Sequence, residues 1–157
     1  MRFQDETQFE NHLRELINQK ICSANADVIV MESKNLADIV ICRNGLSPAI
    51  FFIEVKHLKP SMGRLGFGGV NGSGFQPEIL TKRPEYLEKN LIWVLYSETH
   101  ENNDGIVILT SEELCNDFLQ GNSIGDKYNG IKKSLFNTRD GVMDEQFITY
   151  VNSWLGS

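Results

Sequence analysis

The chain has few cysteines and no run of apolar residues long enough to cross a membrane. Its three cysteines, Cys22, Cys42 and Cys115, lie far apart and form no Cys-x-x-Cys pair or Cys/His cluster. This spacing excludes a disulfide framework and a structural zinc site, so we interpret them as buried free thiols. The apolar runs at 50–53 and 91–95 are the length of strands. A membrane span would need roughly 18 apolar residues, so a transmembrane protein is excluded as well.

Positive charge is also in short supply. The 157 residues include 15 Lys and Arg against 21 Asp and Glu, which gives a formal net charge of -6. This balance argues against a protein that holds nucleic acid by bulk electrostatics alone. It still allows a nucleic-acid enzyme, because bound divalent cations or a local basic patch offset the repulsion. Residues 1–6 include acids where a secretory signal would have its apolar core, so we expect a cytoplasmic protein.

The composition is typical of one soluble globular domain, and we interpret residues 1–157 as a single domain without repeats or linkers. Apolar periodicity predicts helices, and segments rich in Val, Ile and Phe predict strands. The predicted elements are a helix over 5–19, strands over 28–31, 36–42 and 49–56, an irregular glycine-rich loop over 63–74, a helix over 76–89, strands over 91–97 and 105–109, a helix over 111–119, a turn-rich segment over 121–138 and a helix over 143–154. This order predicts an α/β sandwich around a central mixed β-sheet.

Three charged residues interrupt the apolar strands. Glu54 and Lys56 lie two apart, which places both on one face of their strand, and Asp38 interrupts the strand before it. If the two strands form an antiparallel hairpin centred on Leu46, Asp38 faces Glu54 and Leu36 faces Lys56. The sequence therefore predicts that two carboxylates and an amine converge.

Two carboxylates that face each other repel unless something positive lies between them. Oxygen ligands without His or Cys suit Mg²⁺ or Mn²⁺, which bind through one or two carboxylates plus substrate phosphate. Lys56 would then orient or deprotonate the attacking water, or neutralise charge on the phosphate. Hydrolysis of a phosphodiester is the reaction class that these residues indicate.

This pattern resembles the PD-(D/E)xK nucleases, the restriction-endonuclease-like superfamily. Asp38 matches the first element of the signature, and Glu54 and Lys56 match the second. The resemblance extends to Glu10 in the first helix, where many members have a metal-associated Glu, and to Gln76 after the core strands, where some have a Gln near the active site. It implies a three-layer α/β/α sandwich in which Asp38, Glu54 and Glu10 are metal ligands and Lys56 is the catalytic lysine.

The sequence departs from the family pattern at two points. Ala37 stands where the signature has its name-giving Pro, a position that is loose in the family. The spacing from Gln76 to Tyr86 does not fit the Gln-x-x-x-Tyr element of the exonuclease branch. The resemblance therefore implies an endonuclease more than an exonuclease.

Basic residues gather around the glycine-rich loop. The loop has no Gly-Lys-Ser/Thr, so it is neither a P-loop nor a dinucleotide fingerprint. We predict that it follows a DNA backbone, since glycines allow close approach, although a loop with no such role is the alternative. The residues assigned to DNA binding are Lys59, Arg64, Lys82 and Arg83.

The sequence thus predicts a Mg²⁺- or Mn²⁺-dependent DNA endonuclease of restriction or defence type. We expect a homodimer, because cutting both strands of a duplex needs two active sites related by a two-fold axis. One alternative is a structure-specific nuclease such as a Holliday-junction resolvase. Another is a non-catalytic binding or assembly subunit in which Asp38, Glu54 and Lys56 are a residual salt-bridge cluster. The alternatives to a catalytic role are that Asp38 is a solvated residue of an edge strand and that Glu54 and Lys56 are an exposed ion pair at a strand end.

Overall fold

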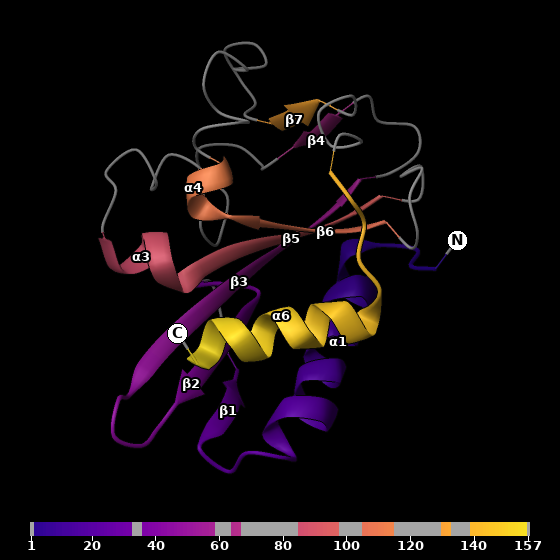
Figure 1. Cartoon of the computed structure of the whole chain (residues 1–157). Coiled ribbons are helices and arrows are strands. Elements are labelled where there is room, and N and C mark those ends of the chain that lie inside the picture. The colour runs from indigo at the N-terminus through magenta and orange to yellow at the C-terminus, as the bar shows by residue number, and fades with distance from the viewer. Residues whose placement is uncertain are drawn as a thin grey trace.

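A computed structural model of the chain describes residues 2–32, 36–58, 64–66, 85–97, 105–114, 130–132 and 139–156. The helices are α1 (Glu6–Ile17), the π-helical turn η1 (Asn18–Cys22), α3 (Glu85–Asn90), α4 (Ser111–Glu113) and α6 (Asp144–Gly156) (Figure 1). The strands are β1 (Val28–Met31), β2 (Ile39–Arg43), β3 (Ala49–Leu58), β4 (Arg64–Gly66), β5 (Leu91–Ser97), β6 (Ile106–Thr110) and β7 (Gly130–Lys132).

Five of the strands form one mixed sheet in the order β1-β2-β3-β5-β6. Strands β3 and β5 are parallel, and the other neighbours are antiparallel. The predictions of an α/β fold and of a mixed sheet are therefore confirmed. The described residues contain no helix with the length and apolar character that a membrane crossing needs.

Helix α1 begins as the sequence predicts and runs further. The carboxylate of Asp5 accepts a hydrogen bond from the Gln8 amide at 2.8 Å, which caps the first turn. Phe9, Leu13 and Ile17 share one face and are fully buried. The helical path continues through η1, three residues past the predicted end at residue 19, because Ile21 extends the buried face.

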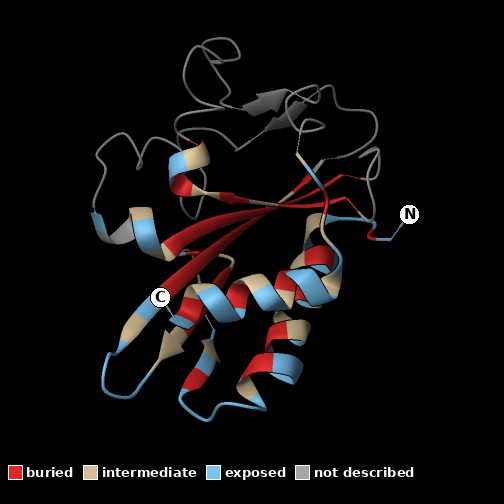
Figure 2. Cartoon of the chain, viewed as in Figure 1, coloured by how far each residue is buried: buried red, intermediate tan, exposed pale blue. Residues whose placement is uncertain are grey.

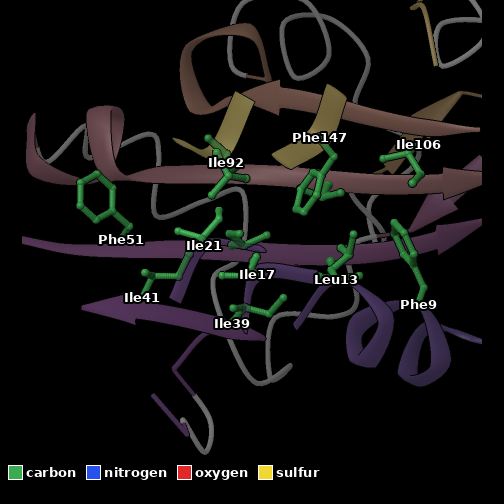
Figure 3. Close-up of a cluster of buried hydrophobic side chains, with 14 of the residues drawn as sticks. Phe9, Leu13, Ile17, Ile21, Ile39, Ile41, Phe51, Ile92, Ile106 and Phe147 are labelled. Carbon is green, nitrogen blue, oxygen red and sulfur yellow. The ribbon is translucent and has the colours of Figure 1, made fainter. Parts of the chain in front are cut away.

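Helices α1 and α6 lie together against one face of the sheet (Figures 1 and 2). Figure 3 shows Phe9, Leu13 and Ile17 of α1 and Phe147 of α6 pointing toward the strands. The strand residues that meet them include Ile39, Ile41, Phe51, Ile92 and Ile106. This cluster fixes α1 on the sheet, which matters because α1 also provides acidic side chains to the site described below.

The opposite face of the central strands is apolar too. Trp93 and Leu95 alternate with Ile92 and Val94 along β5, and all four are at most 1% exposed. Strand β5 is buried along its whole length, as a central strand next to a parallel neighbour should be.

Several element predictions need correction. The glycine-rich loop was expected to be irregular, yet Arg64–Gly66 is strand β4, which pairs with β7 inside the segment expected to be turn-rich. This pairing joins residues far apart in sequence, so local composition does not encode it. The second strand begins at Ile39 and not at residue 36, and the last helix runs to Gly156.

The cysteine prediction is correct in one respect and wrong in another. Cys22 and Cys42 are free thiols, but both are only partly buried. Partial burial nevertheless raises the pKa of the Cys22 thiol, because the thiolate loses hydration. Cys115 lies outside the described residues.

Candidate functional site

The hairpin of β2 and β3 has the predicted register. Its ladder runs from Arg43 opposite Ala49 to Ile39 opposite Ile53, so Asp38 and Glu54 are the next facing positions. Gly45 in the turn has φ +102°, in the left-handed region that favours glycine. The prediction that Asp38 faces Glu54 therefore follows from a register that the structure confirms.

Asp38 lies where the ladder between the two strands ends. Its Oδ2 accepts a hydrogen bond from the backbone amide of Val55 at 2.7 Å. The side chain thus takes an amide that a continuing strand would pair with backbone, which explains why β2 begins only at Ile39. Strand β2 lies between β1 and β3 and is not an edge strand, and Asp38, which immediately precedes it, is partly buried.

Glu54 and Lys56 are not an exposed pair at a strand end. Glu54 is 1% exposed, and its Oε2 lies 3.6 Å from Lys56 Nζ, whose side chain is 14% exposed. An ionised carboxylate so deeply buried is costly unless charge and hydrogen bonds compensate it. The ammonium of Lys56 supplies part of that compensation.

Glu6 belongs to the same cluster, although the sequence analysis did not single it out. Its Oε1 lies 3.9 Å from Lys56 Nζ, and its Oε2 accepts a hydrogen bond from the His57 amide at 3.3 Å. Glu6 lies one turn before Glu10 on α1, and this i, i+4 spacing on a helix that packs on the sheet was the signal that could have found it.

The electrostatics of Glu6 show how closely the acids gather. Partial burial, the largest effect, raises the pKa of Glu6 above its ordinary value. The Lys56 ammonium and the His57 amide lower this pKa, whereas the negative charges of Asp38 and Glu10 raise it. Acids from α1 and from the residue that precedes β2 therefore act on one another at this end of the hairpin.

Glu10 has a basic partner of its own. Arg14 Nη2 lies 2.7 Å from Glu10 Oε1, and the same nitrogen donates to the backbone oxygen of Asp38 at 2.5 Å. Glu10 is thus tied to the segment that carries Asp38. Its assignment as a metal ligand stays a prediction.

The side chains of the remaining predicted site residues are not described by the structure. Gln76, Lys59, Lys82 and Arg83 lie outside the described residues, and so does the side chain of Arg64, whose backbone is in β4.

The oxygen atoms at this site are of the type that a hard divalent cation binds. Asp38 and Glu54 offer carboxylate oxygens, and Mg²⁺ is often held by one or two carboxylates, with waters and substrate phosphate completing the shell. Within the described parts of the chain, no group of three or more His, Cys, Asp or Glu side chains is arranged to hold a metal by itself. A cation here would thus need oxygen atoms from water or phosphate, which is the usual situation for Mg²⁺ at a phosphoryl site.

The fold and the site together define an α/β protein with a half-buried cluster of carboxylates and one lysine at the end of a central hairpin. The chain matches no model of a known protein family, and it has no significant match among curated proteins.

Proposed function

We propose that the protein is a Mg²⁺-dependent DNA endonuclease of restriction or defence type, with a restriction-endonuclease-like α/β/α sandwich as its fold. The observation that carries the proposal is the hairpin register, which places Asp38 next in line to face Glu54 with the Lys56 ammonium 3.6 Å from the Glu54 carboxylate. This register supports the proposal, because metal-dependent phosphodiester hydrolysis uses two carboxylates and an amine of the kind that Asp38, Glu54 and Lys56 offer.

In this proposal each residue has a distinct role. Asp38 and Glu54 would hold the cation, which would supply charge stabilisation for the scissile phosphate and promote deprotonation of the attacking water. Lys56 orients the attacking water or offsets the charge that develops on the phosphate. Glu6 is a second anionic partner of the Lys56 ammonium, because its Oε1 is 3.9 Å from Nζ.

The substrate and assembly parts of the proposal rest on charge and symmetry. A protein of net charge -6 needs cations to bring a phosphate backbone close to clustered acids. We propose duplex DNA as the substrate and a homodimer as the assembly, because a two-fold axis presents one active site to each strand.

A non-catalytic binding or assembly subunit is the second candidate. The observation that favours it is the ion-pair geometry, since Lys56 already lies within 4 Å of both Glu54 and Glu6. A purely structural cluster of this kind is satisfied by its own lysine and has no use for a divalent cation. The two candidates therefore differ in how the folded protein responds to metal.

Metal binding gives the first prediction. Mn²⁺ at about 100 times its Kd should stabilise the wild-type protein by about 2.7 kcal/mol and raise the Tm by about 5–10 °C. Asp38→Ala should lose this gain, because it removes one of the two carboxylates. Differential scanning fluorimetry with MnCl2, with Asp27→Ala as the matched control at an acid near the hairpin turn, measures both. Equal shifts in wild type and Asp38→Ala, or no shift at all, would favour the structural cluster.

A further inference from the structure

One basic residue of α1 lies at the site without touching its lysine–glutamate pair. The Arg14 side chain is about one-quarter exposed, and its Nη2 donates to Glu10 Oε1 at 2.7 Å and to the Asp38 backbone oxygen at 2.5 Å. A single guanidinium nitrogen thus joins the first helix to the residue that precedes β2. Neither the PD-(D/E)xK signature nor the residues assigned above give Arg14 a role.

Asp38 is consequently held from two directions. Arg14 binds its backbone oxygen from the side of α1, and the Val55 amide binds its carboxylate from β3. Because β2 begins only at Ile39, Asp38 lies just outside the ladder that pairs β2 with β3. The hydrogen bonds from Arg14 and from the Val55 amide therefore hold Asp38 in place where the strand pairing does not.

We propose that Arg14 is a positioning residue that fixes Asp38 for cation binding, with Glu10 orienting the guanidinium. This inference rests on the proposed metal site. Groups that orient a metal ligand through hydrogen bonds commonly change metal affinity by about 10- to 100-fold when they are removed. Arg14 acts through the backbone of the ligand, and it touches neither cation nor substrate.

The charge of Arg14 and its positioning of Asp38 predict opposite changes in cation affinity when Arg14 is replaced. Arg14 is a positive charge within hydrogen-bond distance of Asp38, so electrostatics alone predicts that removing it strengthens cation binding. Loss of positioning predicts weaker binding, since the carboxylate would no longer be held in one orientation. The sign of the change therefore separates the two effects.

The test is the Kd for Mn²⁺, measured from the electron paramagnetic resonance signal of free Mn²⁺ during a titration with MnCl2. The variants are Arg14→Met, which keeps the length and helix propensity of the side chain, and Arg14→Lys, whose ammonium retains donors for both acceptors. We expect Arg14→Met to bind Mn²⁺ at least about tenfold more weakly than wild type, and Arg14→Lys to recover most of the affinity.

A second measurement needs no metal. Hydrogen exchange followed by NMR reports on the Val55 amide, which donates to Asp38, and on the Val94 amide as a reference in β5. Arg14→Met should speed hydrogen exchange at the Val55 amide and leave exchange at the Val94 amide unchanged, because only the hydrogen bond from Arg14 to the Asp38 backbone oxygen is lost. A general loss of stability would instead affect both amides.

Each outcome of the two measurements supports or overturns the positioning role of Arg14. Weaker Mn²⁺ binding by Arg14→Met, recovery in Arg14→Lys and faster exchange confined to Val55 support the positioning role. Equal or tighter binding by Arg14→Met, no recovery by Arg14→Lys, or unchanged exchange at Val55 overturns it while the metal site stands. A wild-type protein that binds no Mn²⁺ overturns the proposed function, and this inference with it.

Discussion

Replacing Lys56 with Met should abolish DNA cleavage and at the same time tighten the binding of Mn²⁺. The ammonium lies 3.6 Å from the Glu54 carboxylate and 3.9 Å from that of Glu6, so it repels a cation that approaches the same oxygens. Without it, we expect the Kd for Mn²⁺ to fall by about tenfold, which corresponds to about 1.4 kcal/mol. Cleavage should fall by at least about 10²-fold, since charge stabilisation of the phosphate is lost.

The same substitution should weaken the fold when no cation is present. Glu54 is 1% exposed, and removing the nearby ammonium leaves a deeply buried carboxylate with less compensation. Added Mn²⁺ should therefore stabilise Lys56→Met more than wild type. Lys89→Met is the matched control, because the Lys89 side chain is exposed and, among the contacts that the structure describes, its ammonium pairs only with Glu85 on its own helix. Weaker Mn²⁺ binding by Lys56→Met would show that the lysine does not compete with a cation.

Replacing Phe9 with Ala should cost about 3–5 kcal/mol in the free energy of unfolding. Phe9 is fully buried, and its ring centroid lies 5.0 Å from that of Phe3 and 5.3 Å from that of Tyr96. The cavity would form directly between α1 and the sheet, where the apolar face of the helix is anchored (Figure 3).

Phe9→Leu is the matched control and should cost about 1.5 kcal/mol or less, because it conserves most of the volume. Urea denaturation followed by circular dichroism measures both variants. Well below its unfolding transition, Phe9→Ala should still bind Mn²⁺, since the apolar Phe9 side chain offers no ligand to a metal. A cost below about 1 kcal/mol for Phe9→Ala would contradict the packing of α1 described above.

The hairpin is the part of the site that sequence predicts best. Its paired positions are mostly apolar and lie close together in sequence, joined by a turn that contains Gly45, so local spacing alone sets which residues face each other. The side-chain period of two then places Glu54 and Lys56 on one face without further information. The same reasoning predicted α1 from its apolar spacing, and the structure confirms both.

The contributions of α1 to the site could not be predicted in the same way. Glu6 and Arg14 reach Lys56 and Asp38 only because α1 packs across the end of the hairpin, and the rotation of a docked helix is set by tertiary packing. The family resemblance implies a role for Glu10, and it says nothing of Glu6. The structure pairs Glu10 with Arg14 and places Glu6 beside Lys56.

The beginning of β2 is a second feature that the sequence does not predict correctly. Leu36 fits the apolar pattern of that strand, yet it is 47% exposed and precedes the strand. The Asp38 carboxylate takes the Val55 amide and ends the ladder, and a side chain that replaces a backbone acceptor leaves no periodic signal in sequence. The pairing of β4 with β7 was missed for a related reason, because it joins two segments that are distant in sequence.

DNA cleavage is measured by incubating the purified protein with supercoiled plasmid, linear duplex, branched and single-stranded DNA in Mg²⁺ or Mn²⁺. Glu54→Gln, which keeps the shape of the buried side chain and removes its charge, is the control. For an endonuclease that uses Glu54 as a metal ligand, we expect nicks or discrete fragments that require the divalent cation and disappear in Glu54→Gln. Wild-type protein that leaves duplex, branched and single-stranded DNA intact, or cleavage that persists in Glu54→Gln, would contradict the proposed function.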